Sequence, residues 1–198
     1  MQITYKEIIQ NWTNEQVIEE KIVTLAERVR DIPYGSIGSR DPLDVYTMNK
    51  GTCSGKHELL KGLYKELGLE VKDCLIMHRF KQLPVKFPEE INEILERTDI
   101  VDPHNYFQVK INNKWLTIDI TWDKQLKGLG FPVNENWDGM SDMEIAVAPG
   151  GTVYEPEDPI AKKKELINEL PEQVQEDRKL FLKKCTEWLN DLRSNNEI

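Results

Sequence analysis

Residues 104–122, HNYFQVKINNKWLTIDITW, alternate between apolar and polar side chains over most of their length. Asn112 and Asn113 interrupt this alternation near its middle, and asparagine tolerates the backbone angles of a two-residue hairpin turn. The pattern therefore predicts two antiparallel strands joined at these asparagines. The expected partners across the hairpin are Ile111 and Lys114, Val109 and Leu116, Phe107 and Ile118, and Asn105 and Ile120.

The two faces of this hairpin differ in chemistry. Because side chains alternate along a strand, one face collects apolar residues and is predicted to cover the core: Phe107, Val109, Ile111, Leu116, Ile118 and Ile120. The opposite face carries His104, Tyr106, Gln108, Trp115, Thr117, Asp119 and Thr121. His104 and Asp119 are diagonal neighbours there, roughly 7–8 Å apart along the backbone, so their side chains can meet. From spacing alone, a polar strand face with ordinary cross-strand contacts is an equally good interpretation.

Helical periodicity and turn residues organise the rest of the chain. A capping box at Thr13 and Gln16 predicts a helix that ends near Ile32, and a second helix is expected from Cys53 to Gly68. The other expected elements are a long ordered loop over 33–52, a strand over 70–80, a short helix over 88–97, an irregular segment over 123–159, and helices from 160 onward that Pro171 divides.

These elements predict an α+β fold in which N-terminal helices pack on an antiparallel sheet and C-terminal helices follow. A chain of 198 residues is long enough for one domain with a buried core. We expect a single domain over 1–198, with its core at about 13–155 and a C-terminal helical segment at about 160–194. No internal repeat is visible in the sequence.

Composition excludes several classes of function. The net charge of −9 argues against nucleic-acid binding, which needs clustered lysine and arginine. The basic run Lys162–Lys164 precedes acidic residues and is interpreted as a solvated helix face. No stretch approaches the run of about 20 apolar residues that spans a membrane, and no signal peptide is visible at the start. We therefore expect a cytoplasmic protein without membrane contacts.

Cys53 is the strongest candidate for a reactive residue. It stands in Gly51-Thr52-Cys53-Ser54-Gly55, where a loop runs into the predicted helix. Unpaired N–H groups and the helix dipole at such a position favour a thiolate. Three cysteines, Cys53, Cys74 and Cys185, do not suggest a disulfide framework, and the latter two are interpreted as packing residues, as is His78.

A thiol nucleophile needs a base, and that base needs a third group to orient it. His104 and Asp119 on the hairpin are the candidates for these two roles. The nucleophile segment, with Leu59, Leu60 and Leu63 after it, and the two strands that carry His104 and Asp119 resemble transglutaminase-like enzymes over roughly residues 20–123. The resemblance implies a papain-like α+β core and a Cys53–His104–Asp119 triad.

The sequence departs from this family at two points. The position two residues after the histidine, where the family often has tryptophan, holds Tyr106. The Cys53 N–H is a natural oxyanion donor, but no second donor can be assigned. The candidates are Asn49, Tyr46 and a side chain of the later loop. As a hypothesis, Tyr106 and Trp115 wall the pocket. Asn49 and Trp137 are the further pocket candidates, Trp137 because its loop, 134–139, follows the aspartate strand and could cover the site.

Three competing interpretations are weaker. His57 lies one helical turn after Cys53, but neighbours on one helix rarely aim at a common substrate atom, so it is interpreted as a surface or structural residue. A phosphate-binding loop would need glycine at position 50, where the chain has Lys50. A metal site built from Cys53, His104 and Asp119 lacks the usual paired ligand motifs. We expect neither a metal nor another cofactor.

The combined prediction is a thiol enzyme that cleaves or transfers an acyl group at an amide bond of a peptide, protein or small amide. The sequence leaves open hydrolysis, slightly favoured, and transfer to an amine. Arylamine N-acetyltransferases and peptide N-glycanases use the same three residue types, but the Arg-Gly-rich segment of the former and the zinc cysteines of the latter are absent. The alternative is a catalytically idle transglutaminase-like module that binds proteins. Oligomeric state is not predicted.

Overall fold

The hairpin predicted from residues 104–122 is part of a four-stranded antiparallel sheet in the computed structural model, which describes residues 3–39 and 41–198. The strand order is β3-β2-β1-β4. The strands are β1 (Val71–Arg79), β2 (Val101–Ile111), β3 (Lys114–Ile118) and β4 (Pro149–Tyr154). Phe107 pairs with Ile118 and Val109 with Leu116, so the predicted register is confirmed.

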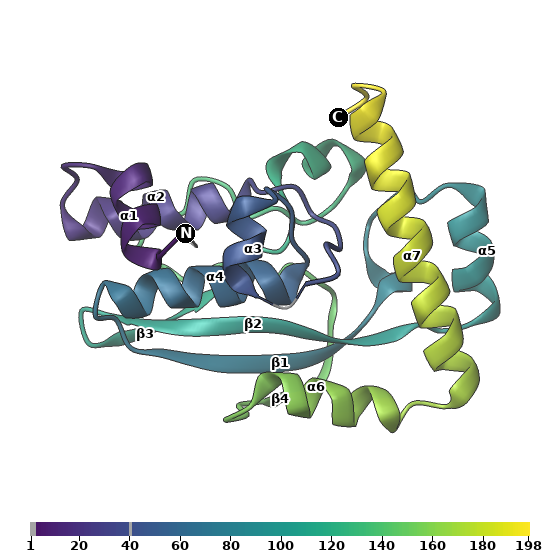
Figure 1. Cartoon of the computed structure of the whole chain (residues 1–198). Helices are drawn as coiled ribbons and strands as arrows, with labels where there is room; N and C mark the ends of the chain where they lie inside the picture. Colours follow the sequence, from purple (N-terminus) through teal and green to yellow (C-terminus); the bar gives the residue numbers. More distant parts are fainter. Residues whose placement is uncertain (1–2, 40) are drawn as a thin grey trace.

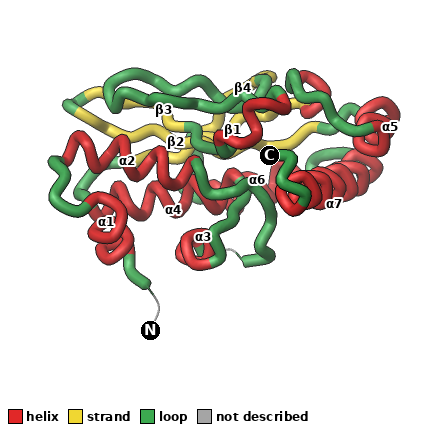
Figure 2. The backbone as a smooth tube through the Cα atoms, turned by 90° about the horizontal axis from the view of Figure 1, so that it is seen from above, coloured by secondary structure: helices red, strands yellow, loops and turns green. Residues whose placement is uncertain are grey.

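Helices cover the sheet and one of its ends. The α-helices are α1 (Tyr5–Thr13), α2 (Ile18–Arg30), α3 (Pro42–Thr47), α4 (Cys53–Glu66), α5 (Glu89–Arg97), α6 (Pro159–Asn168) and α7 (Glu172–Ser194). Two 3-10 helices, η1 (Phe80–Gln82) and η2 (Lys124–Leu129), complete the list. Figure 2 shows α1 to α4 gathered on one face of the sheet, and α7 runs beside α5 at one end (Figures 1 and 2). This arrangement confirms the predicted α+β class.

The N-terminal prediction was wrong in its details. Thr13 does not cap a helix; it ends α1, and its hydroxyl donates to the Ile9 carbonyl at 2.6 Å. The capping box lies instead at Thr4 and Glu7, ahead of α1. The α2 helix begins at Ile18 without a side-chain cap. A helix was nevertheless correctly expected in this segment, because helical periodicity reflects packing and not the cap.

Three further elements were missed. The segment predicted as one long loop, 33–52, contains α3, whose Asp41 N-cap accepts from the Leu43 N–H at 2.9 Å. The segment predicted as irregular, 123–159, contains η2 and β4. The β4 strand is rich in glycine, which weakens the period-two signal. The boundary at Pro171 between α6 and α7 is confirmed.

Two apolar clusters build the interior, and α4 connects them. One lies between α1, α2, α4 and the predicted core face of the hairpin, with Leu59 and Phe107 fully buried. The other lies around α5 and α7 and includes Phe181 and Cys53. The start of α4 is therefore where the clusters adjoin. Within the described residues, no helix is both long and apolar enough to cross a membrane.

Candidate active site

Cys53 is the first residue of α4, as predicted. Thr52, the N-cap, makes no side-chain cap hydrogen bond, so it leaves the first N–H groups of the helix available to another acceptor. The preceding loop packs tightly on α3. A Cβ at Gly51 would lie 2.8 Å from Val45 Cγ1, so glycine is required there for the close approach that places the thiol.

The structure brings together Cys53 at the start of α4, His104 on β2 and Asp119 directly after β3. His104 Nε2 lies 2.6 Å from Asp119 Oδ2. The Cys53 thiol and the His104 ring interact electrostatically, and the other ring nitrogen, Nδ1, is the one that Asp119 does not engage. Asp119 and His104 are almost completely buried, whereas Cys53 is 8 % exposed and lines a cavity. The only part of the group that a substrate can approach is therefore the sulfur side.

The Asp119 carboxylate is held by several donors. Oδ1 accepts from the Thr121 hydroxyl at 2.7 Å and from the Thr121 N–H at 3.2 Å. Oδ2 accepts from the Ala146 N–H at 2.8 Å in addition to His104. Asn134 donates to the Asp119 carbonyl at 2.9 Å. The later loop thus fixes the orienting carboxylate, a role that the sequence pattern did not indicate.

His57 lies beside this carboxylate but does not serve the thiol. The Ile120 N–H donates to His57 Nε2 at 3.0 Å, so that nitrogen is an acceptor. His57 Nε2 also lies 3.4 Å from Asp119 Oδ1. Because both atoms are acceptors, this contact is not a hydrogen bond. Burial lowers the pKa of His57, which agrees with a neutral ring. His57 is a structural residue, and it is buried.

The electrostatics of the site favour a thiolate–imidazolium pair. Burial by itself would raise the pKa of Cys53, but the Lys163 ammonium and the hydrogen bond from His104 outweigh it and lower the pKa to about 7. Burial opposes the charged form of His104 as well, yet the Asp119 carboxylate raises its pKa to about 9. Burial raises the pKa of the other two thiols, Cys74 to about 11 and Cys185 to about 12. Of the three thiols, Cys53 is thus the one whose thiolate form is favoured near neutral pH.

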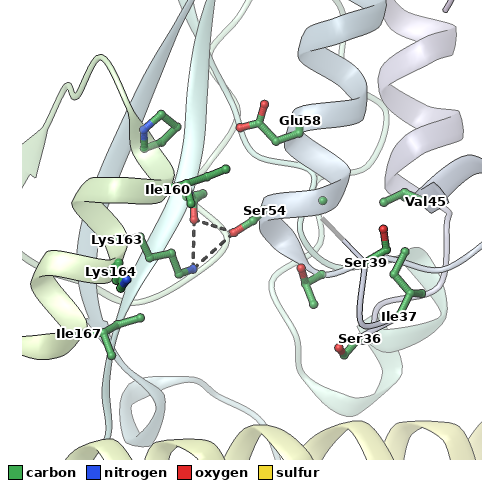
Figure 3. Close-up of a pocket in the computed structure, with 15 residues that line it drawn as sticks. Ser36, Ile37, Ser39, Val45, Ser54, Glu58, Ile160, Lys163, Lys164 and Ile167 are labelled. Carbon is green, nitrogen blue, oxygen red and sulfur yellow. Dashed lines mark hydrogen bonds between the residues drawn. The ribbon is translucent and has the colours of Figure 1, made fainter. Parts of the chain in front are cut away.

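The C-terminal helices contribute charged side chains to the site. Lys163 on α6 donates to Asn105 Oδ1 at 3.1 Å and lies 3.5 Å from the Ser54 hydroxyl (Figure 3). Arg178 on α7 pairs with Asp102, which lies 3.9 Å from Lys163. The interpretation of Lys162–Lys164 as a solvated face was therefore wrong for Lys163, whose side chain is only 18 % exposed. Helical periodicity could not show which lysine faces the sheet.

Two cavities adjoin at the thiol. The larger, of about 590 Å³, is lined by Cys53 and by the middle of α7, from Arg178 to Glu187. The smaller, of about 360 Å³, lies between the start of α4 and α6 and has an apolar wall (Figure 3). The residues that line both are Ser36, Thr52, Ser54 and Lys163. A substrate that reaches Cys53 can therefore extend to both sides of it.

Tyr34 is a site residue that the sequence did not indicate. Its ring packs on Trp122 with centroids 4.5 Å apart, and the residue lines the same cavity as Cys53. Burial and the neighbouring Cys53 raise its pKa well above the ordinary value, so the phenol keeps its proton. Its backbone is fixed by Asp123 and Arg193, at 2.8 Å and 3.0 Å. Within the described part of the chain its hydroxyl has no hydrogen-bond partner.

The structure does not bring the predicted pocket residues to either of these cavities. Trp115 lies near the hairpin end, with Lys72 and Lys110 over its ring. Trp137 packs in the cluster around α4 and donates to the Ser141 carbonyl. Asn49 lines a separate pocket. Tyr106 is buried opposite Cys74 and lines neither of the two cavities at Cys53. The alternation of side chains along the hairpin placed Tyr106 and Trp115 on the correct face of the sheet. It did not show how far along the strands they lie from Cys53.

The predicted candidates for a second oxyanion donor also lie away from the two cavities at Cys53. Tyr46 stacks on Trp12, with ring centroids 5.1 Å apart, and lines neither cavity. Asn49 adopts a left-handed conformation with φ of 48° in the turn after α3. The loop 134–139 holds Asp119 through Asn134 and does not line the cavities at Cys53.

Comparisons with known proteins add little to this geometry. No protein-family model matches the sequence, and no curated protein matches it. A solved structure of a "Putative Cysteine Protease" from Cytophaga hutchinsonii is similar with a TM-score of 0.42 and 15 % sequence identity. The similarity covers 76 % of this chain and 47 % of that chain, so this chain spans about half the length of its structural neighbour. A similarity of this size says nothing about activity, which must follow from the site itself.

Proposed function

We propose that this protein is a cysteine-dependent amide hydrolase of the transglutaminase-like kind, with Cys53 as nucleophile. The observation that carries the proposal is the buried His104–Asp119 pair beside a thiol whose pKa is lowered to about 7. The other two cysteines have raised pKa values, so the lowering is a property of this site. Perturbed pKa values in a cleft mark functional residues.

In the proposed reaction the Cys53 thiolate attacks the amide carbonyl carbon and forms a C–S bond. The carbonyl electron pair moves onto oxygen. When this pair returns, the C–N bond breaks and the leaving nitrogen takes the proton from His104 Nδ1. Water then attacks the thioester, His104 accepts its proton, and the thiolate is released with the free acid. Asp119 stabilises the imidazolium and holds the neutral ring in the tautomer that these steps require.

The oxyanion needs two donors. We assign the first to the Cys53 N–H at the start of α4 and the second to the Tyr34 hydroxyl. The support for Tyr34 is its place in the cavity beside Cys53, its raised pKa and the absence of a competing partner among the described residues. Asp123 and Arg193 restrain its backbone, so the hydroxyl is positioned before the substrate arrives.

The first experiment is alkylation of the native protein by iodoacetamide from about pH 5 to about pH 9, with each cysteine followed by mass spectrometry. We expect rapid labelling of Cys53 near neutral pH, slow labelling of Cys74 and Cys185, and loss of the difference in His104→Ala. If Cys53 reacts no faster than the two buried thiols, the enzyme proposal fails and a binding module becomes the better hypothesis.

The second experiment identifies the acyl acceptor. A peptide-amide library is incubated with the protein in H₂¹⁸O, with and without an added primary amine. Hydrolysis places ¹⁸O in the product acid, whereas acyl transfer gives a new amide. The Cys53→Ser variant is the control, because its hydroxyl lacks the lowered pKa that the thiol has. Formation of the amide as the main product would replace hydrolysis by acyl transfer.

A further inference from the structure

Lys163 is an incompletely neutralised cation at the junction of the two cavities. Its near neighbours are the neutral oxygens of Asn105, at 3.1 Å, and Ser54, at 3.5 Å. The Asp102 carboxylate is farther away, at 3.9 Å, and is already paired with Arg178. Lys163, Arg178 and Asp102 together carry a net charge of about +1. The Cys53 thiolate offsets this charge in the resting site, and the offset is lost when the sulfur forms a bond to carbon. In a chain of net charge −9, this local excess of positive charge lies beside the nucleophile.

The surroundings fix this cation in place. Asp102 is buried, and although burial opposes its charged form, Lys163 and Arg178 hold its pKa below the ordinary value. The carboxylate therefore stays charged and anchors both helices that carry the cations. Figure 3 shows Lys163 extending from α6 toward Ser54 at the start of α4. Its ammonium is thus positioned next to the bond that Cys53 would attack.

We propose that Lys163 binds a substrate carboxylate adjacent to the scissile amide bond, so that the substrates are carboxylate-bearing amides. The inference rests on the proposed function. A partly desolvated ammonium binds a carboxylate through charge-assisted hydrogen bonds, and Lys163 borders both cavities. The carboxylate has two possible sources, the free C-terminus of a peptide on the leaving side or an acidic group on the acyl side.

Two alkylating reagents test the carboxylate site without a known substrate. Iodoacetate and iodoacetamide react with the same Cys53 thiolate, but only iodoacetate carries a carboxylate. The ratio of their rate constants cancels the thiolate fraction, so it is insensitive to the effect of Lys163 on the Cys53 pKa. We expect a ratio about tenfold higher for native Cys53 than for the same thiol in the urea-unfolded protein, the size of one charge-assisted hydrogen bond.

The variants make this test specific. Lys163→Met should lower the ratio about tenfold, and Lys163→Arg should retain most of it. Lys162→Met is the matched control, because Lys162 pairs with Glu165, lies over the Tyr154 ring and lines neither cavity. Its ratio should not change. Circular dichroism checks that each variant folds, and added salt should reduce the native ratio.

The outcomes separate the two proposals. Rapid labelling by iodoacetamide with a ratio equal to that of Lys163→Met would overturn the carboxylate site and leave the thiol enzyme intact. Slow labelling by both reagents would overturn the enzyme and the carboxylate site with it. Pairs of peptide substrates that differ in one carboxylate then distinguish the two possible sources of the bound carboxylate. Preference for a free over an amidated C-terminus, lost in Lys163→Met, assigns the leaving side, whereas preference for acidic over amide residues before the cleaved bond assigns the acyl side.

Discussion

His104 Nε2 lies 2.6 Å from Asp119 Oδ2, and both groups are almost inaccessible to solvent. Thr121 and the Ala146 N–H supply the remaining donors to the carboxylate. A buried carboxylate with this many donors remains ionised. Burial opposes the charged form of Asp119, but the neighbouring His104 and His57 rings together outweigh it and hold its pKa below the ordinary value. The pair therefore fixes the orientation of the His104 ring and favours its protonated form.

The Asp119→Asn variant removes the charge that holds His104 protonated. We expect the pKa of His104 to fall from about 9 toward or below its ordinary value, because only Cys53 then opposes the effect of burial. Amide hydrolysis should fall by about 10³- to 10⁴-fold, as in other triads that lose the orienting carboxylate. NMR titration of the ring protons measures the pKa, and steady-state kinetics measure the rate.

The matched control is Asp142→Asn. Asp142 also accepts a backbone hydrogen bond from the hairpin, from the Thr117 N–H at 2.7 Å, but it is exposed and distant from the thiol in the register. This variant should change neither the His104 pKa nor the hydrolysis rate. If Asp119→Asn left the His104 pKa near 9, the carboxylate would not be the source of the raised value.

The pH dependence follows from the two site pKa values. The thiolate forms as pH rises through about 7, and the imidazolium is lost as pH rises through about 9. Hydrolysis needs both, so kcat/KM should follow a bell-shaped curve with its maximum between these values. Alkylation needs only the thiolate, so its rate should reach a plateau above about pH 7. Since Cys53 and His104 titrate together, the two limbs of this curve give apparent pKa values that belong to the pair and not to either residue alone. A hydrolysis rate that kept rising beyond pH 9 would contradict this assignment.

Stability should depend on the same imidazolium. The folded-state pKa of His104 is raised to about 9, above its unfolded value. This stabilisation is therefore fully present below the unfolded pKa and is lost as pH rises through about 9. Urea unfolding of native protein and of His104→Gln at several pH values measures it. We expect the difference between them to shrink above pH 9, whereas a constant difference would show that His104 acts by packing alone.

Tyr34→Phe separates oxyanion binding from thiol activation. The variant removes one proposed donor and keeps the ring that packs on Trp122. Loss of one oxyanion donor lowers kcat by about 10²- to 10³-fold, whereas alkylation forms no oxyanion and should change little. Rates of peptide hydrolysis and of iodoacetamide labelling, measured on the same preparation, give the comparison. A parallel loss of both rates would instead indicate that Tyr34 acts on the thiol.

The hairpin was predictable from strong local signals, whereas the proximity of His104 and Asp119 was one of two equally good interpretations of its spacing. Period-two alternation across Asn112 and Asn113 gave the register, and the register placed His104 and Asp119 together. The α4 start was visible because the apolar stripe begins after Cys53. The glycine-rich β4 strand lacked such a signal, and α1 was missed because its cap, Thr4, lies close to the chain start.

Long-range contributions to the site were not predictable. Lys163 reaches Ser54 across the fold, and Tyr34 meets Cys53 through a loop whose path depends on Asp123 and α7. Periodicity identifies a buried face but does not say which distant element covers it. Hairpin parity likewise gave the face of Trp115 without its distance from the thiol. The triad lies on elements with regular patterns, whereas the surrounding cleft is formed by tertiary packing.

Phe181→Ala tests whether α7 is an integral part of the site. Phe181 is fully buried, with its ring 4.4 Å from that of Phe80 and 5.6 Å from that of Phe87. Truncation of a buried phenylalanine costs about 3–5 kcal/mol, so the free energy of unfolding in urea should fall by that amount. Since α7 carries Arg178, which anchors Asp102 beside Lys163, labelling of Cys53 at neutral pH should also slow.

Leu180→Ala, on an exposed side of the same helix, is the control and should change stability by less than about 0.5 kcal/mol. Unchanged labelling in a destabilised Phe181→Ala protein would show that the thiol is activated without α7.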